Sequence, residues 1–209
     1  MLFRSGGALV MIHEELRRDP LGMLDLLSRA RVKRLFLPYV ALQQLADAAA
    51  ANPELTLELR EIVTAGEQLV VTPNIRAWLQ RLNARHGCFL ENQYGPSESH
   101  VVTAHRLEGA ACVDWPSLPA IGSPIQNARI YVLDAARQLL PVGVPGELYI
   151  GGVSLARGYL NRQELTDEKF VPNPFVPGER LYRTGDLAAW RANGAVDFLG
   201  RIEIGRAHV

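Results

Sequence analysis

The spacing of hydrophobic and polar positions changes partway along the chain. Before residue 100, short apolar runs alternate with longer stretches in which apolar residues recur at helical spacing. The apolar runs predict strands at residues 8–12, 32–37, 59–63 and 88–90. The periodic stretches predict helices at residues 21–30, 40–51 and 73–86. This alternation predicts a mostly parallel α/β sheet with helices packed on its faces.

After residue 100 the pattern is one of short strands separated by proline and glycine turns. Strands are predicted at residues 101–107, 129–134, 146–150 and 195–199, with a patternless loop at 109–119. A short helix is predicted at 165–170, capped by Thr166 or Asn161. Frequent turns between short strands predict a small antiparallel, β-barrel-like subdomain after the α/β part, with a boundary near residue 118.

Residues 92–98 gather chemistry that suits a nucleotide triphosphate. Gly95-Pro96 forces a tight turn, and the apolar run before it places that turn at the C-terminal end of a strand, where open α/β sheets bind ligands. Tyr94 offers a flat face for a heterocycle, Ser97 a donor for a phosphate oxygen, and Glu98 a hard oxygen for Mg²⁺. An ordinary surface turn with a helix cap is the alternative.

Composition narrows the classes of partner. The chain has 22 Lys and Arg against 22 Asp and Glu, so it lacks the basic surface that binds nucleic acid or acidic membranes. Hydrophobic residues make up 48% of the chain, which is typical of a globular protein. No apolar run is long enough to span a membrane. Two cysteines make no disulfide framework and no signal peptide is recognisable, so a cytoplasmic protein is expected.

The two ends differ in character from the rest of the chain. Residues 1–5 and 204–209 resemble translated sequencing-library adapter, and both are excluded from reasoning about the fold. We interpret the remaining chain as an interior fragment of a longer protein.

A series of short motifs resembles the adenylate-forming enzymes, and most closely the amino-acid-activating adenylation domains of nonribosomal peptide synthetases. The motifs follow the family's order, at residues 64–67, 92–98, 146–160, 182–187 and 198–201. Single short motifs are weak evidence, whereas ordered motifs covering most of a chain are strong. The resemblance implies that residues 6–117 end the large α/β subdomain of such a domain and that 118–203 form its β-barrel-like subdomain.

The resemblance also implies a reaction. A carboxylate substrate attacks the α-phosphate of ATP to give an acyl-adenylate and pyrophosphate, and the acyl group then passes to the phosphopantetheine thiol of a carrier protein. The implied cofactors are ATP and Mg²⁺, and the implied partner is a peptidyl carrier domain in the same parent chain. Glu98 matches the Mg²⁺-binding glutamate, and Ser97 matches a position that the family often fills with threonine.

Several positions match the family's nucleotide contacts. Tyr94 matches the residue that stacks on adenine, and Asp186, following Gly185 in a turn, matches the carboxylate that grips the ribose hydroxyls. Arg201 matches a nucleotide-contacting arginine, and Phe198 stands where the family often has tyrosine. The remaining positions implied to bind the nucleotide are Gly66, Glu67, Asn92 and Gly95.

The acyl-substrate pocket is only partly present. Its implied walls are Val63, Ala65, Gln93, Val101 and Val102. The family's glycine-rich phosphate loop and its lysine-bearing C-terminal subdomain are missing, so the fragment alone is expected to be poorly active or inactive.

Other interpretations stay open. The chain could belong to an acyl-CoA or aryl-acid ligase of the same superfamily, or to a non-catalytic module that binds nucleotide or a partner protein. At single positions, Asp186 could satisfy the backbone of its own turn, Tyr94 could be a core tyrosine, and Glu98 a surface carboxylate.

Overall fold

The computed structural model describes residues 6–202, and both predicted adapter-derived ends lie outside these residues. The chain forms two compact units. The first unit holds the chain up to Glu91 together with Leu107–Leu118, and the second unit holds Asn92–Arg106 and the chain from Pro119 onward. The predicted division into residues 6–117 and 118–203 of a parent domain stays a prediction.

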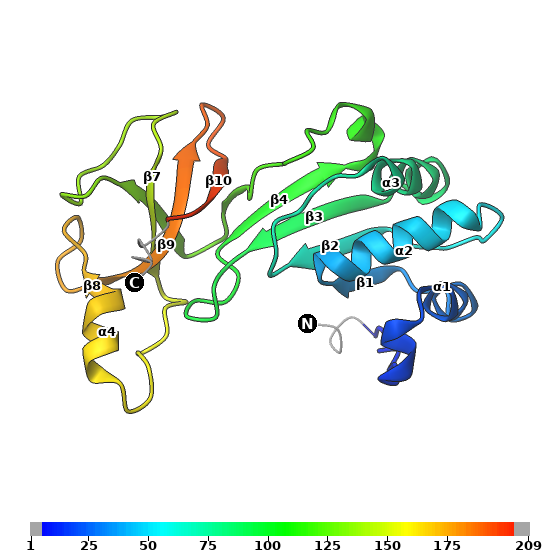
Figure 1. The fold of residues 1–209 in the computed structure, drawn as a ribbon, viewed down its shortest axis with the longest axis horizontal. Coiled ribbons are helices and arrows are strands. Elements are labelled where there is room, and N and C mark those ends of the chain that lie inside the picture. The colour runs from blue at the N-terminus through cyan, green and yellow to red at the C-terminus, as the bar shows by residue number, and fades with distance from the viewer. Residues whose placement is uncertain (1–5, 203–209) are drawn as a thin grey trace, which may run out of the picture. The chain divides into compact units, whose positions relative to one another are not determined.

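The first unit is built from helices and short strands. Its elements are the 3-10 helix η2 (Glu15–Arg18), α1 (Pro20–Arg29), β1 (Arg34–Leu37), α2 (Tyr39–Ala51), β2 (Glu61–Ala65), α3 (Pro73–His86) and the 3-10 helix η3 (Gly109–Asp114). Strands β3 (Phe89–Tyr94) and β4 (Thr103–Glu108) carry the chain from one unit to the other. Figure 1 shows these elements along the chain, with α1 and α2 beside β1 and β2.

The predicted helices form, and local chemistry explains where they begin. Asp19 caps α1 by accepting a hydrogen bond from Gly22 N at 3.0 Å, with Pro20 in the first turn. Thr72 caps α3 in the same way, 3.3 Å from Ile75 N. At its other end α3 stops at Gly87, whose φ of 67° lies in the left-handed region that ends many helices.

The core of the first unit packs the helices against the strands. Fully buried side chains come from α1, α2, α3, β2 and β3, among them Leu24, Leu42, Ile62, Leu79 and Leu90. Strands β1 and β2 run parallel, with Leu35 opposite Ile62. The strand order of this sheet is β1-β2-β3-β4-β5, where β5 is Ser123–Pro124.

Two expectations for the first unit were wrong. Residues 8–12 form no strand, and Leu9 and Met11 are 54% and 78% exposed, so this apolar run pairs with no strand among residues 6–202. Residues 109–119 are not a patternless loop, because η3 occupies the first half of them. The Arg76 guanidinium fastens the segment by donating to the carbonyl groups of Cys112, Val113 and Trp115.

The second unit is an antiparallel sheet with one short helix. Its elements are β5, β6 (Ala128–Leu133), β7 (Gly146–Gly152), α4 (Gln163–Lys169), β8 (Phe170–Pro172), β9 (Arg180–Trp190) and β10 (Val196–Arg201). The strand order is β10-β9-β7-β6, and β8 also pairs with β9. Buried residues from several strands form its core, including Val102, Ile130, Leu148, Ile150 and Val196. The predicted fold class, a mostly parallel α/β sheet followed by an antiparallel β-barrel-like part, is confirmed.

The second unit also departs from the sequence expectations. Asp186 lies inside β9, the longest strand, rather than in a turn. Strand β3 runs on through Tyr94, beyond its predicted end at Leu90, and the predicted turn at Gly95-Pro96 follows it directly. Helix α4 is preceded by Arg162 without a side-chain cap, which excludes both predicted caps. Thr166 instead accepts a hydrogen bond from Tyr159 N and donates one to Arg162 O.

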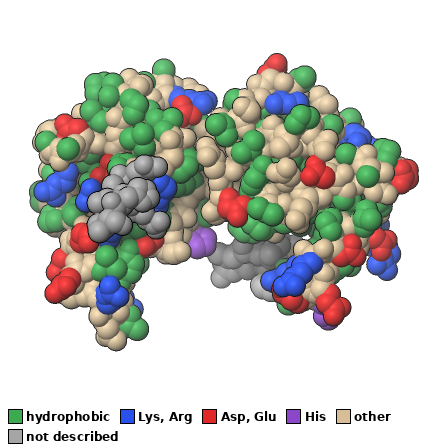
Figure 2. All heavy atoms as spheres, in the orientation of Figure 1, with side chains coloured by type: hydrophobic (Ala, Val, Ile, Leu, Met, Phe, Trp, Pro, Cys, Tyr) green, Lys and Arg blue, Asp and Glu red, His purple; other side chains and the backbone are tan. Residues whose placement is uncertain are grey.

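The surface carries charges of both signs. On the face shown in Figure 2, Lys and Arg side chains are interspersed with Asp and Glu rather than gathered by sign. Among residues 6–202, no helix combines the length and apolar character needed to cross a membrane.

Candidate functional site

The turn after β3 is tight because its backbone approaches itself. A Cβ atom at Gly95 would lie 1.8 Å from the carbonyl oxygen of His100, so only glycine fits there. Two backbone hydrogen bonds close the turn, from Ser99 N to Pro96 O at 3.1 Å and from Val102 N to Tyr94 O at 2.8 Å. The turn therefore holds Tyr94 at its start and Glu98 near its tip in fixed positions.

Asp186 is placed by a bulge in β9. The register between β7 and β9 shifts between Glu147 and Tyr149, and Gly185 has a φ of 73° at this point. Thr184 Oγ1 ties the bulge down, because it donates to Leu148 O at 2.7 Å and accepts from Asp186 N at 2.9 Å. The Asp186 side chain is thereby buried, with 4% of its surface exposed.

Tyr94, Asp186 and Arg201 form one hydrogen-bonded cluster. The Tyr94 hydroxyl donates to one carboxylate oxygen of Asp186, and Arg201 Nη1 donates to the other at 2.7 Å. Burial, followed by the charge of Asp186, raises the pKa of Tyr94, and the hydrogen bond to Asp186 raises the pKa of Arg201. The Phe198 ring lies beside Tyr94, with centroids 6.1 Å apart and a tilt of 38°.

Glu98 belongs to a second cluster in the same unit. The Tyr159 hydroxyl donates to Glu98 Oε1 at 2.5 Å, and Tyr182 affects the pKa values of both Glu98 and Tyr159. Burial acts to raise the pKa of Glu98, but the hydrogen bond from Tyr159, the backbone N–H of Glu98, the Tyr182 phenol and the charge of Arg201 outweigh it, so the pKa is lowered. Glu98 is therefore an ionised carboxylate held by phenol groups.

The structure thus brings together Tyr94, Asp186, Arg201 and Phe198, and places Glu98 against Tyr182 of the same strand that carries Asp186. Ser97 is exposed in the turn beside Glu98. Asn92 is buried and donates from its amide nitrogen to Ala120 O at 3.0 Å, which is a scaffold contact.

The other predicted positions divide between the two units. In the first unit, Val63 is buried within β2, Ala65 ends that strand, and Gly66 and Glu67 follow it in exposed positions. Glu67 Oε2 accepts a hydrogen bond from Val40 N at 3.3 Å. In the second unit, Val102 is fully buried in the core, and Gln93 and Val101 are half-buried.

Sequence reasoning missed the groups that hold the predicted carboxylates. Tyr159, Tyr182 and Thr184 lie inside the motifs at residues 146–160 and 182–187, yet nothing in those motifs says which acid they contact. Glu147 was missed in the same way: it forms an ion pair with Arg183 at 2.9 Å and accepts from Gly185 N at 3.2 Å. Glu147 and Arg183 are distant in the sequence and become neighbours only through the pairing of β7 with β9.

The donor set at Glu98 fits Mg²⁺ only in part. Among the described residues, no group of three or more His, Cys, Asp or Glu side chains could enclose a metal ion. Mg²⁺ is commonly held by one or two carboxylates together with substrate phosphates and water, and an ionised, half-buried Glu98 suits that arrangement. These residues therefore fit a metal that arrives with a polyphosphate.

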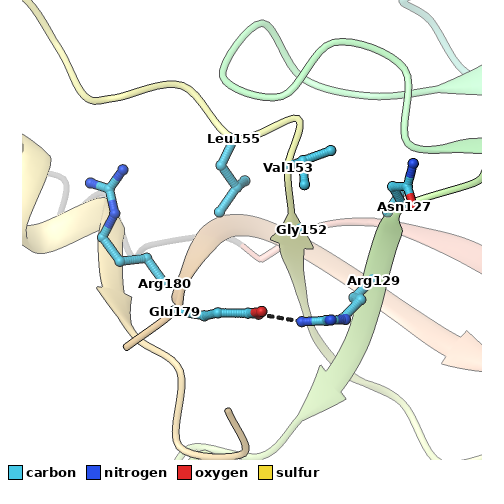
Figure 3. Close-up of a pocket in the computed structure, with 8 residues that line it drawn as sticks. Asn127, Arg129, Gly152, Val153, Leu155, Glu179 and Arg180 are labelled. Atoms are coloured by element: carbon cyan, nitrogen blue, oxygen red, sulfur yellow. Dashed lines mark hydrogen bonds and ion pairs between the residues drawn. The ribbon is translucent and has the colours of Figure 1, made fainter. Parts of the chain in front are cut away.

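A cavity of about 560 Å³ lies elsewhere in the second unit. Arg129 of β6 and Glu179 point toward one another across it and form an ion pair (Figure 3). Its remaining lining residues are Asn127, Ala128, Gly152, Val153, Leu155 and Arg180. It contains none of the residues that the sequence predicted for the site.

Comparison with known proteins identifies the family. The model of the family described as AMP-binding enzyme matches residues 1–160. Because this match covers more than half of the chain, the chain belongs to the AMP-binding enzyme family. Within that family, its curated relatives include synthases of peptide antibiotics. Gramicidin S synthase 2 of Brevibacillus brevis is 45% identical over 199 residues, which cover 95% of this chain and 4% of that protein.

Two further matches agree. Tyrocidine synthase 1 of Brevibacillus parabrevis is 40% identical over 203 residues, covering 97% of this chain and 17% of that protein. The crystal structure of a four-domain nonribosomal peptide synthetase bound to AMP and glycine matches with a TM-score of 0.76 and 31% identity, over 94% of this chain and 14% of that one. The predicted resemblance is confirmed, and the chain spans a small part of each of these relatives.

Proposed function

We propose that this chain is part of an amino-acid-activating adenylation domain. In the proposed reaction a substrate carboxylate oxygen forms a bond to the α-phosphorus of ATP, and the bond from that phosphorus to the β-phosphate oxygen breaks and releases pyrophosphate. A carrier-bound phosphopantetheine thiol then attacks the acyl carbon, and AMP leaves. The observation that carries the proposal is the Tyr94, Asp186 and Arg201 cluster on a chain related to peptide synthetases.

The nucleoside end of ATP is assigned to this cluster. A carboxylate has about four lone-pair sites, and Tyr94 and Arg201 occupy one on each oxygen of Asp186, so acceptor capacity remains for a vicinal diol. The hydrogen bond to Asp186 anchors the Tyr94 hydroxyl and Phe198 lies beside the ring, an arrangement that suits stacking on adenine. The Arg201 side chain is 70% exposed, and its other N–H groups are available to the nucleotide.

The phosphate end is assigned to the turn after β3. Glu98 would hold Mg²⁺, which neutralises phosphate charge when bound, and the exposed Ser97 hydroxyl would donate to a phosphate oxygen. Catalysis of this step rests on position and charge rather than on a covalent intermediate with the protein. The protein's contribution is therefore to hold the nucleoside end and the phosphate end of ATP in fixed positions relative to one another.

The acyl substrate, the carrier domain and the location in the cell belong to the proposal as well. Gln93 supplies an amide and Val101 a small apolar wall for an amino-acid side chain. The pocket roles of Val63, Ala65 and Val102 and the nucleotide-binding roles of Gly66 and Glu67 stay predictions. A peptidyl carrier domain in the same parent chain and a cytoplasmic location also stay predictions.

Substrate-dependent exchange between ATP and labelled pyrophosphate tests the proposal. The parent enzyme that contains this chain is assayed with a panel of amino acids, fatty acids and aryl acids. We expect one or a few amino acids to stimulate exchange. Stimulation only by fatty or aryl acids would favour an acyl-CoA or aryl-acid ligase, and no stimulation by any acid would favour a non-catalytic binding module.

A further inference from the structure

The Glu98 carboxylate is held from a distant loop, residues 154–160, rather than from its own turn. The Tyr159 hydroxyl donates to Glu98 Oε1 at 2.5 Å, and the Tyr182 phenol contributes to lowering the pKa of the same carboxyl group. We propose that Tyr159, supported by Tyr182, is a positioning residue that fixes the Glu98 carboxylate in the orientation that receives Mg²⁺ with the ATP phosphates. The inference rests on the proposed role of Glu98 in the adenylation reaction.

Both ends of Glu98 are anchored to this loop. Its carbonyl oxygen accepts a hydrogen bond from Ala156 N at 2.7 Å, while its carboxylate accepts from Tyr159. A glutamate in a turn otherwise samples several rotamers, and ordering it on metal binding would carry an entropic cost. With backbone and carboxylate both fixed, one carboxylate orientation is selected before the metal arrives, and the lone pairs that the tyrosines do not use stay available.

Tyr159 is itself held rigidly enough to do this. Its backbone N–H donates to Thr166 Oγ1 at 2.9 Å, and its ring packs edge-on against Phe170 with centroids 5.7 Å apart. Phe170 also contacts the Tyr182 ring, at 5.1 Å, so one phenylalanine orients both phenols. The fit between loop and helix is close, because a Cβ atom at Gly158 would lie 2.5 Å from Thr166 Cγ2.

Arg180 fixes the loop from the sheet side. Its guanidinium donates to Arg157 O at 3.0 Å and to Ala156 O at 3.2 Å, and it lies over the Phe170 ring at 5.3 Å from the centroid. Figure 3 shows Arg180 and Leu155 among the side chains that line the cavity. These contacts hold the loop in place within the second unit, so the Tyr159 hydroxyl has a fixed position.

A purely structural tie between loop and turn is the competing interpretation, and the two interpretations predict different readouts. Removing only the hydroxyl, as in Tyr159→Phe, keeps the ring contact with Phe170 and the backbone bond to Thr166. If the hydroxyl only tied the loop, thermal stability would fall while the Mg²⁺ requirement stayed unchanged. If it positions Glu98, the concentration of Mg²⁺ giving half-maximal exchange rises, while the KM for the amino acid changes little.

The test compares wild type, Tyr159→Phe and Tyr182→Phe in the parent enzyme. Two quantities are measured: the half-saturating Mg²⁺ concentration for pyrophosphate exchange, and the thermal shift caused by ATP with Mg²⁺ compared with ATP in EDTA. Outer partners of metal ligands typically affect metal affinity or activity by about 10-fold to 100-fold, so we expect about a 10-fold higher half-saturating Mg²⁺ for Tyr159→Phe and a smaller Mg²⁺-dependent thermal shift. Tyr131→Phe, whose ring stacks on Phe175 at 5.2 Å, is the control and should match wild type.

Each outcome separates the inference from the proposed function. If wild type shows Mg²⁺-dependent exchange and a Mg²⁺-dependent thermal shift, and both tyrosine variants keep these values, the positioning role is wrong while adenylation stands. If wild type itself shows neither exchange nor a shift with ATP, the proposed function is wrong and the inference falls with it. If Tyr159→Phe does not fold, Tyr182→Phe provides the same comparison, with a raised Mg²⁺ requirement expected.

Discussion

At the scale of single residues, hydrogen bonds to Asp186 join side chains from three strands. It lies in β9, and its carboxylate receives Tyr94 from the end of β3 and Arg201 from the end of β10. A buried carboxylate without such partners would be strongly unfavourable. The cluster therefore explains both how Asp186 can be buried and why an aromatic ring and a guanidinium have fixed positions beside it.

Removal of the Asp186 carboxylate should abolish adenylation. In Asp186→Ala both the proposed contact with the ribose and the anchor of the Tyr94 ring are lost, so exchange should fall by about 100-fold or more. Asp197→Ala is a matched control, because it removes a comparable ion pair with Arg191 from β10 and should retain exchange. Wild-type-like exchange in Asp186→Ala would refute the assignment.

Glu98→Ala should be equally damaging for a different reason. The proposed metal ligand disappears, and phosphate charge is no longer neutralised at the turn, so exchange should again fall by about 100-fold or more. Binding of ATP in EDTA, followed by thermal shift, should change little, since the nucleoside end is held by Asp186. Exchange at the wild-type rate would remove Glu98 from the mechanism.

The two cysteines should be unreactive in the folded protein. Cys88 is fully buried, and burial raises its pKa to about 12, with a further contribution from the charge of Glu61. Its folded pKa lies above the unfolded value, so the stability it contributes is complete below about pH 9 and is lost as pH rises toward 12. A disulfide exchange reagent at pH 8 should label Cys88 only after unfolding, and rapid labelling of native protein would contradict the buried position.

At the scale of elements, the bulge in β9 sets the position of Asp186. Gly185 takes a left-handed φ of 73°, and Glu147 and Thr184 bond the backbone on either side of it. A regular strand would leave Thr184 and Asp186 on one face in simple alternation. The register between β7 and β9 shifts at this point, and the Asp186 carboxylate meets Arg201 from the neighbouring strand β10 and Tyr94 from the end of β3.

Gly185→Ala tests this role of the bulge. There is room for a Cβ atom, but an L-residue at this φ is strained, so the free energy of unfolding should fall by roughly 1 kcal/mol and exchange should fall with it. Gly194→Ala carries the same kind of strain, at a φ of 81° in the turn after β9, and should lose similar stability while keeping exchange. Equal exchange in the two variants would show that the bulge has no part in the site.

The helices and the candidate site residues could be predicted from the sequence, whereas the contacts between their side chains could not. Helices α1 and α3 were predictable because proline and cap residues mark their starts and Gly87 marks an end. Strand β9 was missed because its buried positions include the polar residues Thr184 and Asp186, so its alternation in burial is not an alternation of hydrophobic and polar residues. Tyr159 and Glu98 are 61 residues apart in the sequence, so only the folded structure reveals their hydrogen bond.

At the scale of the whole molecule, the chain is two units within a family whose members here are much longer. Each unit has its own buried core, and the Tyr94, Glu98, Asp186 and Arg201 clusters all lie within the second unit. The chain spans 4% of Gramicidin S synthase 2 and 17% of Tyrocidine synthase 1. The activity proposed here is accordingly that of the parent enzyme.

Balanced surface charge predicts weak binding to polyanions. The formal net charge is zero, and both signs are interspersed on the face shown in Figure 2. Binding to nucleic acid draws mainly on clustered Lys and Arg that neutralise phosphates, so the chain should pass through a heparin column at about 0.1 M salt. Retention that weakens steeply with added salt would reveal a basic surface that this account does not include.

The most direct test is a crystal structure of the parent adenylation enzyme with a non-hydrolysable ATP analogue and Mg²⁺. The account predicts ribose hydroxyls within about 3.2 Å of the Asp186 carboxylate, adenine against the Tyr94 ring, and the metal between Glu98 and the phosphates. A nucleotide bound elsewhere, for example in the cavity between Arg129 and Arg180, with Asp186 and Glu98 far from it, would contradict the central claim.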